Sequence, residues 1–206
     1  MATHSNVLAW RIPGTGREGH LLQDTKRTRR PRMTYISLDF ETTGTVRGSQ
    51  NEPWQLGLVA VTDGRPVPGT QWETFFRIPP DRPFSPRAPG RWAELRDMLA
   101  DAPSFMDIWP ELFARLVGHP LVAHNAATER PILEKRVPLA PFGPWNDTLA
   151  IVRARWPRLP SYALGDLIAT FGLAGQVDAL CPGRTWHDAL YDACAGAVLF
   201  CHACCA

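Results

Sequence analysis

An alternating segment near the start of the chain brings two carboxylates together. The segment is Tyr35-Ile36-Ser37-Leu38-Asp39-Phe40-Glu41. Because successive side chains of a β-strand point to opposite faces, Ser37, Asp39 and Glu41 share one face of an extended strand. Ionised neighbours of like charge repel, and a divalent cation between them removes the repulsion. The segment therefore predicts a metal site at the end of a strand, although an edge strand with a solvated polar face would show the same alternation.

A further acidic position follows another short apolar run. His124 and Asn125 come directly after Leu121–Ala123, which predicts a short buried strand, and Glu129 lies shortly beyond them. Thr128 is a plausible N-cap for a helix that begins at Glu129. A glutamate at a helix start commonly compensates the helix dipole, so Glu129 by itself indicates no chemistry.

The third candidate group is His187 with Asp192. On one helix their side chains would point about 140° apart, given ~100° per residue. They can serve one site if His187 precedes the helix and Asp192 lies in its second turn. Small residues in the same segment would let the helix pack closely on a sheet: Ala189, Ala193, Ala195 and Ala197.

The segments that must position these residues follow an α/β pattern. Alternating apolar runs predict strands, and a change to helical periodicity predicts helices later in the chain. The expected strands are 34–40, 55–62, 71–78 and Leu121–Ala123, and a proline-rich loop covers 79–89. The expected helices are 92–100, 107–117, 129–136, 148–155, 161–171 and 188–201. Strands first and helices around later strands indicate one layered α/β domain over residues 34–206.

Length and composition set the class of protein. The chain has 206 residues, of which 45% are hydrophobic, a size and composition that suit one globular domain. No apolar run reaches the ~18 residues that span a bilayer, and the start of the chain lacks the apolar core of a signal peptide. We therefore expect a cytoplasmic protein with no membrane contact.

Charge is distributed unevenly along the chain. Residues 1–33 carry seven Lys/Arg against two acidic residues, whereas the remainder carries fifteen basic and eighteen acidic residues. A basic arm without apolar periodicity predicts a flexible segment at 1–33. It could contact nucleic acid, or it could be a solubilising tail or a vector-like leader.

Five cysteines lie in the last 26 residues, at 181, 194, 201, 204 and 205. A disulfide framework would spread them through the chain, and a zinc finger would need another ligand pair elsewhere. We expect reduced, unliganded cysteines and set a zinc-binding module aside.

Taken together, the motifs resemble the histidine-bearing branch of the DEDD superfamily of 3′–5′ exonucleases, the DEDDh or DnaQ-like exonucleases. The resemblance covers about 34–200. It rests on three motifs in order: Asp39-Phe40-Glu41-Thr42-Thr43-Gly44, Leu121-Val122-Ala123-His124-Asn125-Ala126-Ala127 and His187-Asp188-Ala189-Leu190-Tyr191-Asp192. The resemblance implies a ribonuclease H-like α/β domain with a central mixed five-stranded sheet flanked by helices.

The resemblance also implies a division of labour among the site residues. Asp39 would bridge two Mg²⁺ or Mn²⁺ ions, with Glu41 and Asp192 on the ion that activates water and Glu129 on the other. His187 would take the proton of the attacking water. The substrate implied is the 3′ end of single-stranded DNA or RNA, with DNA favoured. Contacts to it would come from Thr42, Thr43, Gly44, His124 and Asn125.

The chain departs from the family pattern at three places. Glu129 stands where the family usually has aspartate, and Thr128 stands where it has an aromatic residue. Gly90-Arg91-Trp92 replaces the usual His-Gly pair before a helix. The apolar wedge of the family could be Trp54, Leu56 or Trp92. Glu129 and the basic arm keep open an alternative, namely a catalytically weakened relative that binds nucleic-acid ends or a protein partner.

Overall fold

The structure, a computed structural model, describes residues 33–205. The expected basic arm at 1–33 therefore lies outside the described residues, apart from Met33. Residues 32–206 form one compact unit. Within 33–205, no helix has the length and apolar character needed to cross a membrane.

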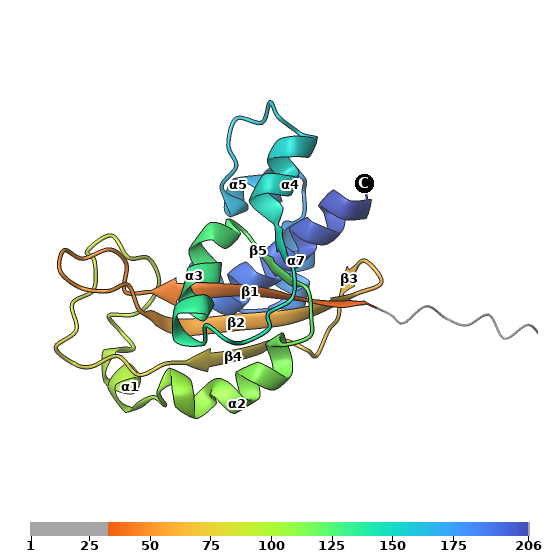
Figure 1. Ribbon diagram of the computed structural model, residues 1–206. Helices are drawn as coiled ribbons and strands as arrows, with labels where there is room; N and C mark the ends of the chain where they lie inside the picture. Colours follow the sequence, from red (N-terminus) through yellow and green to blue (C-terminus); the bar gives the residue numbers. More distant parts are fainter. Residues whose placement is uncertain (1–32, 206) are drawn as a thin grey trace, which may run out of the picture. The chain divides into compact units, whose positions relative to one another are not determined.

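A single mixed sheet forms the centre of this unit (Figure 1). Its strand order is β3-β2-β1-β5-β6, and β4 also pairs with β2. The strands are β1 (Thr34–Thr42), β2 (Pro53–Thr62), β3 (Arg65–Pro66), β4 (Trp72–Phe75), β5 (Leu121–Ala123) and β6 (Trp145–Asp147). The mixed α/β architecture expected from the sequence is confirmed, with six strands because the two-residue β3 is added. Neither β3 nor β6 is long enough to give a periodic signal in the sequence.

Strand direction brings the candidate residues to one edge of the sheet. β1 runs antiparallel to β2 and parallel to β5, and β5 runs parallel to β6. The carboxyl end of β1, with Asp39 and Glu41, therefore lies beside the end of β5, where His124 follows. The register of β1 against β2 shifts between Glu41 and Thr42. Such irregularities locally bend a strand and re-aim its side chains, often beside active sites.

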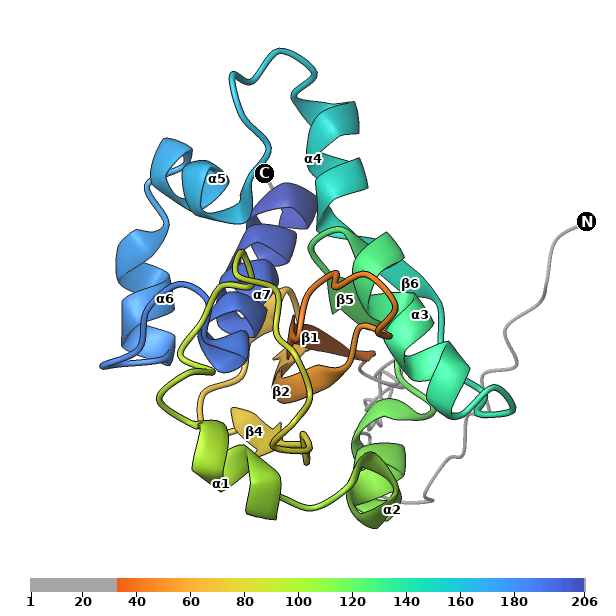
Figure 2. The same ribbon diagram turned by 90° about the vertical axis from the view of Figure 1, so that its left-hand side faces the viewer.

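Helices cover both faces of the sheet (Figures 1 and 2). One face carries α7 (Ala189–Cys205), with α4 (Thr148–Arg155), α5 (Leu164–Thr170) and α6 (Ala174–Leu180) packed around it. The other face carries α2 (Phe105–Leu116) and α3 (Ala126–Arg136), which meet the apolar side of β1. α1 (Arg96–Asp101) lies over a third, smaller apolar cluster with residues of the preceding loop. Ile36, Leu38 and Phe40 face α2 and α3, so Asp39 and Glu41 face α7, as the alternation predicts.

Small residues let α7 approach the sheet closely, as expected. The Ser37 hydroxyl donates to the Ala193 carbonyl at 2.8 Å. A methyl group on Gly57 would lie 2.3 Å from the Ala189 carbonyl oxygen and from the Leu190 backbone. The first turn of α7 thus rests directly on the backbone of β2.

The starts of α1, α3 and α5 differ from the sequence prediction, and α5 begins at Leu164 rather than at 161. α3 begins at Ala126 rather than at Glu129, and its N-cap is Asn125 in the left-handed conformation (φ 69°) rather than Thr128. Asparagine tolerates this conformation better than most residues. α1 begins at Arg96 rather than at 92, because Trp92 is held in the loop by a hydrogen bond from its indole to the Ala88 carbonyl (3.1 Å).

α6 had no counterpart in the sequence prediction. It is seven residues long and buries only Val177, so its pattern was too weak to detect.

The contact between α7 and β2 yields a stability prediction. Gly57→Ala should lower the free energy of unfolding by about 1–3 kcal/mol, the usual cost of overpacking, because both neighbouring groups are backbone. Chemical denaturation measures the change. Gly175→Ala is the matched control, since a methyl group there meets nothing within 4 Å and alanine favours the helix. Equal stability of the two variants would contradict this packing.

Candidate active site

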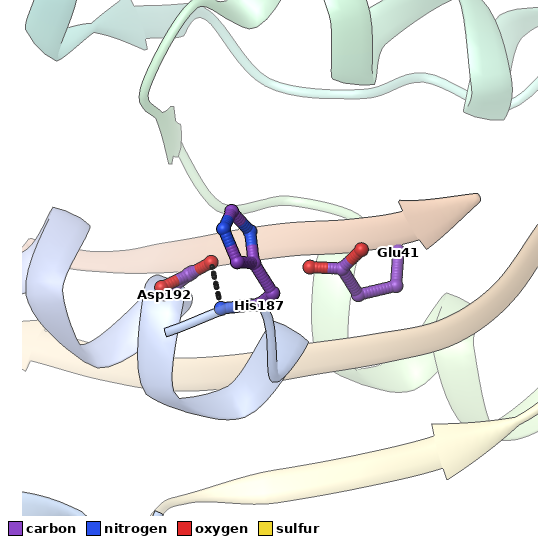
Figure 3. Close-up of side chains that lie close together, drawn as sticks. All are labelled: Glu41, His187 and Asp192. Atoms are coloured by element: carbon purple, nitrogen blue, oxygen red, sulfur yellow. Dashed lines mark hydrogen bonds between the residues drawn. The ribbon is translucent and has the colours of Figure 1, made fainter. Parts of the chain in front are cut away.

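The five predicted catalytic residues come from four separate elements. Asp39 and Glu41 end β1, and Glu129 lies in the first turn of α3. His187 lies two residues before the start of α7, and Asp192 lies in the first turn of that helix. Figure 3 shows Glu41, His187 and Asp192 facing one another across the gap between β1 and α7.

Glu41, His187 and Asp192 form a tight donor group. One possible ligand atom from each lies within 4.8 Å of the others. The His187 backbone N–H donates to Asp192 Oδ2 at 3.1 Å. The expectation that His187 precedes the helix is confirmed, whereas Asp192 lies one turn earlier than expected. The wide angle that a common helix would impose therefore does not arise.

His187 has a left-handed backbone (φ 65°), which is rare for a residue with a side chain. Such a conformation costs on the order of 1–3 kcal/mol and persists only where the surroundings enforce it. In this conformation the exposed ring lies towards Glu41 while the backbone N–H donates to the Asp192 carboxylate. The strain is thus located at the residue that the family resemblance assigns to proton transfer.

The carboxylates repel one another and are withdrawn from water. Burial, followed by the charges of Asp39 and Asp192, raises the pKa of Glu41 to about 9. Burial also raises the pKa of Asp192 to about 7, against a hydrogen bond from the His187 backbone that lowers it. Without a cation, these groups hold protons at a pH where ordinary carboxyl groups are ionised.

Asp39 and Glu129 share this environment. Burial and then the Asp192 charge raise the pKa of Asp39 well above its ordinary value. Burial and then the Asp39 charge raise the pKa of Glu129, while a hydrogen bond from the Phe40 backbone lowers it. The mutual effects place Glu129 in the same electrostatic cluster as the carboxylates of β1.

Two carboxylate oxygens in this cluster are buried without a hydrogen-bond partner among the described residues. They are Glu129 Oε2 and Asp192 Oδ1. An unpaired buried acceptor is costly, and a bound cation would satisfy it. Hard cations such as Mg²⁺ and Mn²⁺ prefer carboxylate and water oxygens, so the donor set fits such an ion.

A polar network anchors the first turn of α7. Asp188 Oδ1 accepts the N–H groups of Leu190 (3.1 Å) and Tyr191 (3.4 Å), as an N-terminal capping residue does. Arg184 Nη1 in turn donates to both carboxylate oxygens of Asp188 at 2.9 Å. The residue next to His187 is therefore fixed on two sides.

The network continues into the sheet. Arg184 also pairs with Glu73 of β4, with Nη1 2.7 Å from Oε2. Gln55 Nε2 donates to the same Glu73 oxygen at 3.1 Å, and Gln55 Oε1 accepts the Ala189 N–H at 3.3 Å. Sequence reasoning did not predict this network, whose side chains are those of Gln55, Glu73, Arg184 and Asp188. The spacing of Arg184 and Asp188 was a usable signal, whereas the partnership with Glu73 spans 111 positions.

The predicted substrate contacts on the first motif serve the fold as well. The Thr43 side chain is buried, and its hydroxyl accepts the Glu52 N–H at 3.0 Å. The Thr42 hydroxyl accepts the Gly44 N–H at 3.3 Å. Gly44 has φ 71°, and a methyl group on it would lie 2.8 Å from Ser85 Cβ. Glycine is thus required here by the backbone and by the adjacent loop.

His124 is also engaged inside the protein. Its Nε2 lies 3.0 Å from the Tyr162 carbonyl, which can only accept, and its Nδ1 lies 2.9 Å from the Thr148 hydroxyl. Burial lowers the pKa of His124, so the neutral ring links these two segments. Asn125 is exposed at the same sheet edge and remains accessible to a substrate.

Of the three wedge candidates, only Trp92 is partly exposed. Trp54 and Leu56 are fully buried. The Trp92 ring stacks on Phe84 with centroids 4.4 Å apart. Of the described cysteines, Cys181 and Cys194 are buried and free.

Comparisons with known proteins agree with this geometry. Residues 36–200 match the family of exonucleases described as RNase_T. The chain is 30% identical over 171 residues to a PolC-type DNA polymerase III of Thermotoga petrophila, covering 81% of this chain and 12% of that protein. It is 32% identical over 155 residues to exodeoxyribonuclease 10 of Escherichia coli, covering 75% of this chain and 61% of that protein. The chain thus spans less than two thirds of either relative.

A solved structure of exonuclease X in complex with 5′-overhanging duplex DNA has the same fold. It superimposes with a TM-score of 0.61 at 30% identity and covers 83% of this chain and 90% of that chain.

The raised pKa values give the metal-free protein a specific pH dependence. Glu41 releases its proton near 4.5 when unfolded but near 9 when folded, so the free energy of unfolding should fall as pH rises between these values. Asp192, whose pKa in the folded protein is about 7, should likewise lower the free energy of unfolding as pH rises towards that value. Added Mg²⁺ should oppose the trend, since a cation binds the deprotonated ligands.

Thermal denaturation over about pH 5–9, in EDTA and in Mg²⁺, measures both effects. Glu41→Gln should flatten the EDTA profile. A parent profile in EDTA that is already flat would contradict the clustering of these carboxyl groups.

Proposed function

Because the chain belongs to the RNase_T exonuclease family, we propose that it is a metal-dependent 3′–5′ exonuclease acting on the end of single-stranded nucleic acid. The observation that carries the proposal is the convergence of Asp39, Glu41, Glu129 and Asp192 with His187 at one sheet edge. DNA is favoured over RNA, since the relatives named above are a DNA polymerase and an exodeoxyribonuclease.

The four carboxylates would hold two Mg²⁺ or Mn²⁺ ions. Such ions, when bound, supply positive charge to the attacking and leaving oxygens of a phosphodiester displacement. Asp39 interacts electrostatically with both Asp192 and Glu129, which suits it to contact both ions. The orphaned oxygens of Glu129 and Asp192 offer one further ligand atom each.

His187 would act as the general base. Its ring is exposed to the site, while its backbone N–H is fixed on Asp192. Histidine is the residue type whose ordinary pKa allows proton uptake near neutral pH. The anchored backbone leaves the ring free to accept a proton from water beside Glu41.

The substrate strand would enter along the exposed edge near Asn125 and the turn at Thr42 and Gly44. Direct contacts by Thr43 and His124 are less well supported, since both side chains are engaged internally. Contact of the basic arm with nucleic acid and a cytoplasmic location stay predictions.

The activity test is a panel of 5′-labelled single-stranded and duplex DNA and RNA with Mg²⁺ or Mn²⁺. We expect a ladder that shortens from the 3′ end, fastest on single-stranded DNA. Asp39→Asn should reduce cleavage by at least about 10²-fold, the scale of a single catalytic group. The same change should raise the melting temperature in EDTA, because it removes a repelling carboxylate. Full cleavage by a folded Asp39→Asn variant would exclude the proposed site.

Glu129 separates an active exonuclease from a weakened relative. Glu129→Gln keeps the side-chain size but loses the charge, so Mg²⁺ affinity and activity should fall by at least on the order of tenfold. We also expect Glu129→Asp to lower activity, because the site is built around the longer side chain, whose carboxylate accepts from the Phe40 backbone. Metal titrations of both variants on one oligonucleotide measure this. Should Glu129→Asp exceed the parent, the native glutamate is a weakening substitution.

A further inference from the structure

Residues 79–92 form a loop that is fixed against both walls of the site. The Ser85 N–H donates to the Thr43 carbonyl at 2.8 Å, which ties the loop to the end of β1. At its other end, a methyl group on Gly90 (φ 88°) would lie 3.0 Å from the His187 carbonyl oxygen. The loop therefore touches two of the three segments that supply the predicted catalytic residues, the first and the third motif.

Arg91 follows this contact directly and points its charge to solvent. Its side chain is 64% exposed, and the only ion pair it forms within residues 33–205 is a 4.0 Å contact with Asp188 Oδ2. Asp188 does not need this partner, because Arg184 already donates to both of its oxygens at 2.9 Å. The Arg91 guanidinium is thus a largely unneutralised cation, on the residue next to Gly90, which packs against His187.

A cation at this position could bind an anionic group of the substrate. A cluster of carboxylates attracts metal ions but repels the phosphates of the strand beyond the cleaved linkage. Arginine binds phosphate oxygens with its planar fork of N–H donors. Arg91 also stands where the chain departs from the family pattern, at Gly90-Arg91-Trp92.

We propose that Arg91 binds a phosphate of the substrate strand other than the one being cleaved. The proposal rests on the proposed exonuclease function and assigns a subsite to it. The phosphate could be the neighbouring internucleotide phosphate or a phosphate on the 3′ end, and both present the same anionic oxygens. Arg91 would strengthen strand binding without contacting the reacting atoms.

The test compares substrates that differ in phosphate content. The p-nitrophenyl ester of thymidine 5′-phosphate has one phosphate, whereas an oligonucleotide offers neighbours. For Arg91→Gln, the ratio of kcat/KM on the oligonucleotide to that on the ester should fall about tenfold, the scale of one lost charged hydrogen bond. The loss should appear in KM, and Arg91→Lys should recover part of it. Arg65→Gln, an exposed arginine of β3 beyond the opposite end of β1, is the control and should keep the parent ratio.

Modified oligonucleotides identify the phosphate. If the linkage next to the cleaved one is the ligand, a neutral methylphosphonate there should weaken oligonucleotide binding by the parent. Binding by Arg91→Gln should be unaffected. If the terminal phosphate is the ligand, the parent should bind a 3′-phosphorylated oligonucleotide more tightly than its 3′-hydroxyl form. Arg91→Gln should lose that preference.

Binding provides a readout that does not need cleavage. With Ca²⁺ as the metal, the log–log salt dependence of oligonucleotide binding should flatten by about 0.7 in Arg91→Gln. Equal losses on ester and oligonucleotide would show that Arg91 instead positions Asp188 and overturn the proposal. Unchanged ratios and salt slope would also overturn it. A parent that binds oligonucleotide with this Arg91 dependence but cleaves neither substrate would refute the exonuclease function and leave the Arg91 subsite standing.

Discussion

Repulsion among buried carboxylates is the constraint on which this structure depends. Folding brings Asp39, Glu41, Glu129 and Asp192 to one sheet edge, where burial raises the pKa of each and neighbouring carboxylate charges raise it further. The cluster is stable only with protons or cations in it. The capacity to hold a cation and the predicted loss of stability at high pH without one therefore follow from the same arrangement.

The elements around the cluster oppose that repulsion. Asp188, Arg184 and Glu73 fix the first turn of α7, and Gly57 lets that turn rest on β2. The ion pair between Arg184 and Glu73 is partly exposed, and such a pair adds little net stability because solvent screens its attraction. Its value here is positional, since it holds His187 in a strained backbone conformation directly beside Asp188.

Several of the predicted substrate contacts are engaged within the fold itself. Thr43, Gly44 and His124 were expected to meet the substrate, but each has a structural role within the protein. The loop that packs on Gly44 and reaches His187 carries Gly90-Arg91-Trp92, one of the three places where the chain departs from the family pattern.

The sequence by itself determined the local features. The alternation of Ile36 to Glu41 placed both carboxylates on one face, and the small residues of α7 predicted its close packing. Only the tertiary structure decided which predicted contacts remain accessible and what anchors α7. Hydrogen bonds join Thr43 to Glu52, His124 to Tyr162 and Arg184 to Glu73, across 9, 38 and 111 positions of the sequence. Local periodicity reports which face a side chain occupies, whereas hydrogen-bond partners this distant are set by how the chain returns to the sheet.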